Sequence, residues 1–528
     1  MRLASYQHLS LMSSLLQLQS LRLFVLIAVL MMSACAKHND VNESRPNIVL
    51  IMADDLGYSD LGVYGGEIET PHLDQLAADG IQFTQFYNNA KCTESRASLL
   101  SGLYHHQSKN FSLDNHVTIA EVLRDAGYGT MMSGKWHLPG NPVERGFDRY
   151  FGFLVGAVNF FTGMQWGSDE NPMRLDDQVF NVPEEGFYTT DAFTDYAIDF
   201  IDEATEQSKP FFLYLAHNAP HFPLHAWPDD IAKYEDRYLD GWDALRLERY
   251  ERMQEMGLLD AAWSLSPRDD YVPAWDLLDE DQKAEEAHLM AVYAAMVDRM
   301  DQNIGRLMHY LGEKNLVDNT IVLFMSDNGG CPYAFNHTPD IPPGPKEGYR
   351  TYDSEWANAS NTPFRLYKQY GHEGGIASPF IVHWPAGIPN PGTRSDQVGH
   401  LIDIMPTLLE AANTTYPTSF NGYDVLPQEG ISLMPVFKGE TLAERPPIFW
   451  EFWGNRAVRV GDWKLVAERS KDWELYNVEA DRSELNNLLE AESEKTAQMA
   501  GMYDDWAARS TARTNEEGKA MQPSSQAR

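Results

Sequence analysis

Three apolar segments constrain the fold more than any other feature of this sequence. They begin at Pro46, Pro210 and Thr320, and each runs through six to eight residues before reaching polar side chains at residues 54, 217 and 326. Strands that are apolar on both sides are typical of a parallel sheet covered by helices on both faces. Helical segments with clear start and stop signals at 70–80 and 118–127, and a long amphipathic one at 287–311, lie between these runs. The sequence therefore predicts an α/β sandwich.

The pattern changes after Asn421. Short runs at 447–452, 456–460 and 463–467 predict antiparallel strands joined by turns, followed by a helix over 492–508. We therefore predict a catalytic α/β domain over residues 46–425 and a small antiparallel β subdomain with a helix over 426–510. Residues 511–528 are expected to form a flexible tail.

The N-terminal region predicts export. Arg22 precedes a short apolar run that ends in small residues and Cys35, and the run is too brief to span a bilayer as a mature helix. This resembles a bacterial lipoprotein signal, so we expect a signal peptide over 1–35, lipidation of Cys35 and a polar tether over 36–45. Ordinary signal cleavage nearby is the alternative. The expected location is the bacterial periplasm or the outer membrane surface, with a lipid anchor.

The charge balance excludes some partners. With 77 acidic and 41 basic residues the formal net charge is −36, which argues against binding to nucleic acid or to an anionic membrane surface. The chain has only three cysteines, too few for a disulfide framework even in an exported protein. A site for an anionic substrate would therefore have to be a local positive pocket.

Oxygen-bearing side chains follow two of the apolar runs. Asp54 and Asp55 come directly after the first run, and Asp327 and Asn328 come just after the third. The carboxyl ends of parallel strands meet at the edge of the sheet where α/β proteins bind ligands. Carboxylate and amide oxygens suit Ca²⁺ or Mg²⁺, and the absence of a Cys/His cluster in the sequence argues against zinc. The sequence thus predicts a hard cation at this edge.

The segment from Cys92 to Gly102 places a thiol at the start of a helix and Arg96 one turn later. A helix start offers unpaired N–H groups and a positive dipole, which favour an anion and lower the pKa of a thiol. Further basic candidates, expected at strand ends or nearby loops, are Lys135, His137, His221 and Lys368. Such cations hold the oxygens of a tetrahedral anion, and a histidine can protonate a leaving oxygen. Together they predict a cation-assisted anion site.

The segments that carry these residues, taken in their order along the chain, resemble those of the arylsulfatase-type sulfatases of the alkaline phosphatase superfamily. The resemblance covers residues 45–508 and is carried by the segments 46–57, 92–102, 134–137, 219–224 and 326–329, and by Lys368 ahead of Glu373-Gly374-Gly375. It implies an alkaline-phosphatase-like α/β/α sandwich that hydrolyses sulfate monoesters of aryl or carbohydrate type.

The resemblance also implies a role for each site residue. A formylglycine-generating maturation enzyme oxidises the family's cysteine to formylglycine, whose hydrated aldehyde is the nucleophile, and Cys92 holds that position. The residues that match the calcium ligands are Asp54, Asp55, Asp327 and Asn328, together with the formylglycine from Cys92. Arg96 matches the arginine that positions the nucleophile, and Lys135 and Lys368 match the lysines that hold the sulfate. His221 matches the proton donor to the leaving oxygen. His137 matches the histidine that assists the release of sulfate.

One position departs from the family motif Cys-x-Pro-Ser/Thr-Arg, because Glu94 stands in place of the proline. The proline belongs to the pattern that the maturation enzyme reads. Three outcomes stay open: conversion of Cys92 by a tolerant enzyme, slow activity of the bare thiolate, or loss of hydrolysis. The alternative functions are a phosphonate or phosphodiester hydrolase of the same superfamily and a weakened enzyme that only binds sulfated glycans.

Aromatic residues are candidates for a carbohydrate subsite, although such residues are more often part of a core. The candidates are Trp166, Trp227, Trp242, Tyr349 and Tyr352.

Overall fold

A computed structural model of the protein describes residues 45–108, 111–114 and 116–523. The chain from Pro46 onward forms one compact unit. The predicted signal peptide with Cys35, and the predicted tether up to residue 44, lie outside the described residues. No helix in the described part of the chain combines the length and the apolar character that crossing a membrane would require.

The described residues contain a mixed sheet of eleven strands. Its strands are β1 (Asn47–Asp54), β2 (Ile81–Tyr87), β3 (Gly129–Lys135), β4 (Arg149–Phe153), β5 (Met173–Leu175), β6 (Gln178–Val179), β7 (Phe211–Pro220), β8 (Thr320–Ser326), β9 (Ala377–His383), β10 (Thr393–Ser395) and β11 (Gly399–His400). They are ordered β10-β2-β9-β8-β1-β7-β3-β4-β5-β6, with β11 beside β2. The neighbours β8, β1, β7, β3 and β4 run parallel, whereas β9 is antiparallel to both β8 and β2. The three predicted apolar runs are β1, β7 and β8, which lie side by side.

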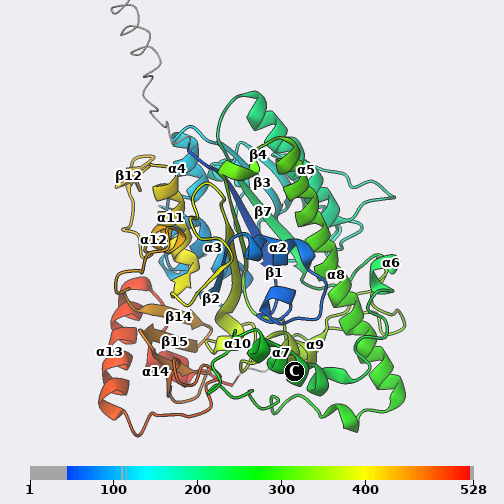
Figure 1. The fold of residues 1–528 in the computed structure, drawn as a ribbon, viewed down its shortest axis with the longest axis vertical. Helices are drawn as coiled ribbons and strands as arrows, with labels where there is room; N and C mark the ends of the chain where they lie inside the picture. The colour runs from blue at the N-terminus through cyan, green and yellow to red at the C-terminus, as the bar shows by residue number, and fades with distance from the viewer. Residues whose placement is uncertain (1–44, 109–110, 115, 524–528) are drawn as a thin grey trace, which may run out of the picture. The chain divides into compact units, whose positions relative to one another are not determined.

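Helices cover both faces of the sheet, as predicted for an α/β/α sandwich (Figure 1). They are α2 (Pro71–Ala78), α3 (Cys92–Ser101), α4 (Ile119–Asp125), α5 (Thr189–Glu206), α6 (Pro228–Ile231), α7 (Gly241–Glu255), α8 (Glu280–Glu313), α9 (Asp353–Ser360), α10 (Glu373–Ile376), α11 (Ile404–Ala411) and α12 (Met434–Phe437). Alternate residues of β1 serve the two cores. Val49 and Ile51 pack with α2, α5 and α8, and Leu50 packs with α3, α4 and α11.

Two predicted helices differ in how well the sequence located their first residues. At α4, Thr118 Oγ1 accepts from the N–H of Glu121, and the Glu121 carboxylate accepts from the N–H of Thr118, so the predicted capping box is present. The helix predicted from residue 287 instead begins at Glu280, as α8, because Asp279 caps it. The first two turns of α8 are charged, so the apolar periodicity that predicts a helix does not extend to its start.

A second, antiparallel sheet follows, as predicted. It consists of β14 (Ile448–Phe452), β15 (Asn455–Val460), β16 (Trp463–Ala467) and β17 (Glu474–Asn477), and α13 (Ser493–Ser510) packs on it through Tyr503 and Trp506. A short hairpin, β12 (Ser419–Phe420) with β13 (Tyr423–Asp424), precedes it. Both sheets belong to the same compact unit, so the boundary predicted near residue 425 separates two sheets rather than two independent units.

The described part of the predicted tail, residues 511–523, contains a short helix. The chain forms α14 (Asn515–Ala520) there, with its capping box at Thr514. Arg513 pairs with the buried carboxylate of Glu451 at 3.2 Å, and Gly518 lies against Arg456. The polar composition of this segment gave no sign of these contacts, because its partners lie about 60 residues earlier in the chain.

Candidate active site

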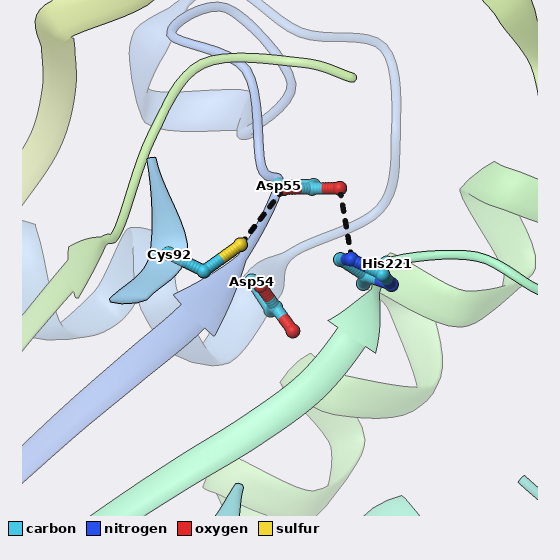
Figure 2. Close-up of side chains that lie close together, drawn as sticks. All are labelled: Asp54, Asp55, Cys92 and His221. Atoms are coloured by element: carbon cyan, nitrogen blue, oxygen red, sulfur yellow. Dashed lines mark hydrogen bonds and ion pairs between the residues drawn. The ribbon is translucent and has the colours of Figure 1, made fainter. Parts of the chain in front are cut away.

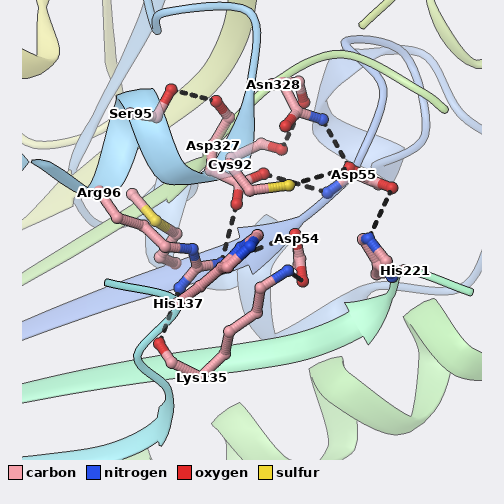
Figure 3. Close-up of polar contacts among 12 residues, drawn as sticks. Asp54, Asp55, Cys92, Ser95, Arg96, Lys135, His137, His221, Asp327 and Asn328 are labelled. Carbon is pink, nitrogen blue, oxygen red and sulfur yellow. Dashed lines mark hydrogen bonds and ion pairs between the residues drawn. The ribbon is translucent and has the colours of Figure 1, made fainter. Parts of the chain in front are cut away.

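The predicted site residues come together at the C-terminal edge of the parallel strands (Figure 3). Asp54 ends β1, Lys135 ends β3, and Asp327 and Asn328 follow β8 directly. His221 follows β7, which lies between β1 and β3 in the sheet. Cys92 and Arg96 enter from α3, and Lys368 enters from the loop before α10. The cluster therefore arises from the topology of the sheet and not from closeness in sequence.

Cys92 is the first residue of α3 and is 1% exposed. The ammonium of Lys368 donates to its sulfur at 3.1 Å, and the carboxylate of Asp55 lies 3.8 Å from the sulfur. Burial and the charge of Asp327 act to raise the pKa of the Cys92 thiol, but Lys135 and Lys368 outweigh them and lower it to about 6. The site thus favours an anionic group at the position of the sulfur.

Asp55 connects the elements of the site. Its backbone is left-handed, with φ of +67°, and its N–H donates to Asp327 Oδ1 at 3.2 Å. Its Oδ1 accepts from Asn328 Nδ2 at 2.7 Å and from Lys368, and its Oδ2 lies 3.6 Å from His221 Nε2 (Figure 2). Burial acts to raise the pKa of Asp55, but Lys368 and His221 hold it far below its ordinary value. Asp55 is therefore a carboxylate.

Arg96 and Lys135 are fully buried cations that bind the carboxylates of Asp327 and Asp54. Arg96 Nη2 donates to Asp327 Oδ2 at 2.8 Å, and its Nη1 donates to the carbonyl of Lys135 at 3.0 Å. Lys135 Nζ donates to Asp54 Oδ2 at 2.5 Å. Arg96 thus fixes α3 on the ends of β3 and β8, which holds Cys92 in place.

The oxygens of the site fit a hard cation. Asp54 Oδ1, Asp55 Oδ2 and Asn328 Oδ1 are buried and accept no hydrogen bond from any described residue. Buried oxygens are costly without a partner, and carboxylate and amide oxygens are the ligands of Ca²⁺ and Mg²⁺. Ligand atoms of Asp54, Asp55, Cys92 and His221 all lie within 4.8 Å of one another. Both oxygens of Asp327 are already engaged, by Arg96 and by the N–H of Asp55.

Comparison with known proteins identifies the family of this chain. The family model described as Sulfatase matches residues 46–414. The chain belongs to the sulfatase family. A second model, described as N-sulphoglucosamine sulphohydrolase, C-terminal, matches residues 364–504 of this sulfatase. Membership makes the protein a sulfuric ester hydrolase.

Relatives match this sulfatase over most of their length. It is 34% identical to an uncharacterized sulfatase of Schizosaccharomyces pombe, over 86% of this chain and 92% of that protein. It is 32% identical to an arylsulfatase of Klebsiella aerogenes, over 78% of this chain and 95% of that protein. Among solved structures, Ps i-CgsB in complex with k-i-k-neocarrahexaose superposes with a TM-score of 0.67 at 27% identity, covering 91% of this chain and 96% of that one.

The two predicted catalytic histidines of the sulfatase differ in surroundings. His137 Nε2 lies 3.2 Å from the hydroxyl of Thr93, and burial, reinforced by Lys135, holds the pKa of His137 well below its ordinary value. His137 is therefore neutral. His221 Nδ1 lies 2.7 Å from the carbonyl of Phe222, which can only accept, so Nδ1 carries a proton and Nε2 faces Asp55.

Three other polar residues near the site in sequence differ in their contacts. Both ring nitrogens of His217 are buried without a hydrogen-bond partner in the described chain, and burial lowers the pKa of His217 to about 3. His372 pairs with Glu474 at 3.3 Å, in the second sheet. Ser95, which the sequence did not single out, donates to the carbonyl of Asp327 at 2.5 Å. Its place in the Cys-x-x-Ser-Arg pattern was the available signal.

A cavity of about 500 Å³ opens beside this cluster. Its lining residues are Lys91, Thr93, Glu94, Phe111, His137, Tyr333, Ala334, Phe335, Gln369, Phe452 and Trp453. Glu94 is only 6% exposed, its Oε2 has no hydrogen-bond partner among the described residues, and burial raises the pKa of Glu94 to about 7. The residue that departs from the family motif thus forms part of the cavity wall.

The aromatic residues at this cavity differ from the predicted candidates. Trp242 and Tyr352 are buried in the core, and Trp227 lines a different cavity. Trp166 and Tyr349 lie nearer the surface, and neither lines the cavity beside Cys92. The Phe, Tyr and Trp rings that do line it come from the loop before α4, from the loop after β8, and from the end of β14 with the turn that follows it, three segments with no shared pattern in the sequence.

Proposed function

We propose that this sulfatase hydrolyses sulfate monoesters of aryl alcohols or carbohydrates, with a formylglycine made from Cys92 and one bound Ca²⁺. The observation that carries this proposal is a set of three buried oxygens next to Cys92 that accept no hydrogen bond from any described residue. On this ground Asp54, Asp55 and Asn328 would bind the cation, and Asp327, which follows β8 at the same edge of the sheet, would complete the set.

Other residues of the chain would bind the sulfate and position the nucleophile. Lys135 and Lys368 would hold the free oxygens of the sulfate, since both ammonium groups are buried beside the aspartates that end β1. Arg96 would fix the nucleophile through its contacts with Asp327 and the end of β3. Bound Ca²⁺ would supply positive charge that polarises the sulfate.

Proton transfer completes the reaction. The bond between sulfur and the ester oxygen breaks, the sulfate keeps an oxygen that entered from water by hydration of the aldehyde, and the ester oxygen leaves with a proton. His221 Nε2 would donate this proton as the second proton of the ring, because Nδ1 keeps its own proton against a carbonyl and Nε2 faces the carboxylate of Asp55. The neutral ring of His137, beside Thr93, suits a base that assists sulfate release. Formylglycine would supply, as its hydrate, the attacking hydroxyl.

Glu94 supports a second candidate, a surface protein that binds sulfated glycans without turnover. It occupies the position that the maturation enzyme reads, and its carboxylate borders the anion site. A phosphonate or phosphodiester hydrolase is the alternative within the superfamily, because those esters also present one negative charge. The N-terminal pattern that ends at Cys35 supports the further proposal of export and lipid anchoring.

Mass spectrometry of the tryptic peptide Cys92–Arg96, from protein made in its native host, tests the nucleophile. We expect a mass change that corresponds to conversion of the thiol to an aldehyde. The same preparation is then assayed on 4-nitrophenyl sulfate and on a phosphodiester, and sulfate release should be faster. An unmodified thiol in every preparation would contradict the formylglycine mechanism, and faster phosphodiester cleavage would favour the alternative hydrolase.

A further inference from the structure

A row of aromatic rings leads from the catalytic cavity to the surface. Tyr333 and Phe335 line the cavity, and their ring centroids are 5.4 Å apart. Phe335 is followed by His337 at 5.9 Å, with ring planes 11° apart, and His337 is followed by Trp166 at 5.8 Å, with planes 9° apart. We call Tyr333, Phe335, His337 and Trp166 the aromatic strip.

Neighbouring rings hold the aromatic strip in place. Tyr349 contacts Trp166 at 4.8 Å and His337 at 4.9 Å between centroids. Phe222 contacts Phe335 at 5.7 Å and stacks on His221 at 4.1 Å. A backbone hydrogen bond from the N–H of His337 to the carbonyl of Tyr349 joins the two sides of the loop. The strip is therefore a preformed surface that is continuous with the proton donor of the site.

The strip leaves large apolar surface in contact with water. Trp166 is 48% exposed and Phe335 is 40% exposed. Exposed aromatic groups that are contiguous with one another are typical of a binding surface, whereas isolated ones need no explanation. This strip begins inside the catalytic cavity, so its occupant and the substrate share one path.

We propose that the aromatic strip binds the sugar residues next to the sulfated residue, and that the substrate is therefore an oligosaccharide or polysaccharide. This inference rests on the proposed function and names its substrate class. The apolar C–H face of a pyranose ring stacks on an aromatic ring, and the exposed rings of Phe335 and Trp166 offer such surface at two points along the strip. The imidazole of His337 and the hydroxyl of Tyr333 add hydrogen-bonding groups for sugar hydroxyls. A compact aryl sulfate would occupy the cavity alone and would not reach Trp166.

The test compares Trp166→Ala, His337→Ala and the double variant with the wild type. Three probes are used: k-i-k-neocarrahexaose, a sulfated hexasaccharide from heparan sulfate, and 4-nitrophenyl sulfate. For each hexasaccharide that the wild type binds, we expect KM to rise about threefold to tenfold per ring removed. If the protein does not turn the hexasaccharide over, Kd is measured instead and should rise by the same factor. The value of kcat/KM for 4-nitrophenyl sulfate should stay unchanged. Tyr271→Ala is the matched control, because Tyr271 is 66% exposed and does not belong to the strip.

The outcomes separate the strip from the hydrolytic function. Equal affinity of the wild type and the variants for the hexasaccharides, or no preference of the wild type for the hexasaccharides over 4-nitrophenyl sulfate, would overturn the strip while sulfate release stands. Absence of sulfate release from all probes, with hexasaccharide binding that depends on Trp166, would overturn the proposed hydrolysis and support the strip in a glycan-binding protein.

Discussion

Replacing Lys464 by methionine should destabilise the protein and weaken its active site. Lys464, on β16, lies 2.9 Å from Glu373 Oε1 and 2.8 Å from Glu484 Oε1, and all three side chains are fully buried. Glu373 keeps a second cation, Arg482, at 2.8 Å. Glu484 forms no other ion pair within the described residues. The variant would therefore leave one buried carboxylate without a cation.

This ion network also holds the segment that carries Lys368. Glu373 begins α10 five residues after Lys368, and its N–H donates to the Glu484 carboxylate at 2.9 Å. From β15, Asn455 Nδ2 donates to the carbonyl of Gln369 at 2.9 Å. The second sheet thus fixes the loop whose lysine contacts Cys92. Loss of Lys464 should lower kcat for sulfate release as well as stability.

The magnitude follows from the burial. Removing one partner of a buried ion pair costs about 3–5 kcal/mol, because an uncompensated charge remains. That is a large part of the roughly 5–15 kcal/mol by which a typical domain is stable. Burial acts to raise the pKa of Glu373, but Lys464 and Arg482 lower it to about 2. Its folded pKa lies below its unfolded value, so its stabilisation is present above pH 4.5 and is lost as the pH falls toward 2. The variant should lose part of this acid dependence.

Urea unfolding followed by circular dichroism measures the change in stability at constant m-value. The matched control is Lys471→Met, because Lys471 is 59% exposed where it pairs with Glu468 and should contribute only about 0–1 kcal/mol. Lys464→Met with Glu484→Gln should recover part of the loss, since it removes the unpaired charge. A Lys464→Met variant within about 1 kcal/mol of the wild type would refute the reasoning, because a buried pair of this kind should exceed that value.

Three further predictions follow from the site and the core. Removal of divalent cations with EDTA should abolish sulfate release and lower Tm, and added Ca²⁺ should restore both, since three buried oxygens accept no hydrogen bond from any described residue; full activity after EDTA would exclude the cation. Glu94→Pro should increase the fraction of Cys92 converted to formylglycine, measured by peptide mass spectrometry; an unchanged fraction would show that residue 94 does not limit conversion. Burial and the nearby Asp353 and Glu355 raise the pKa of Glu286 to about 8, so the folded state keeps a proton that the unfolded state loses above about pH 4.5, and stability falls as the pH rises through this window. Glu286→Gln should flatten this fall in urea unfolding at pH 5.5 and 7.5, and an unchanged slope would contradict the assignment.

The sequence by itself determined the strands at the centre of the sheet and the edge at which the expected cation ligands lie. The apolar runs of β1, β7 and β8 have to be buried on both faces, which places them inside a covered parallel sheet, and in the structure they are neighbours there. Their polar ends then meet at one edge, so Asp54 and Asp327 could be placed together although 273 residues separate them. The capping box at Thr118 could also be predicted, because its partners lie within one helical turn.

Only the tertiary structure decided which distant side chains complete the site. The aromatic strip joins Trp166 to His337, and the ion network joins Lys464 to Glu373 across 91 residues. Neither pair has a periodic or local signal. Ring stacking and buried ion pairs depend on the path of the loops, which the hydrophobic pattern leaves open. Local hydrogen bonds and burial along a strand depend on residues a few positions apart, and for this reason the sequence determines them and leaves the rest to the assembled fold.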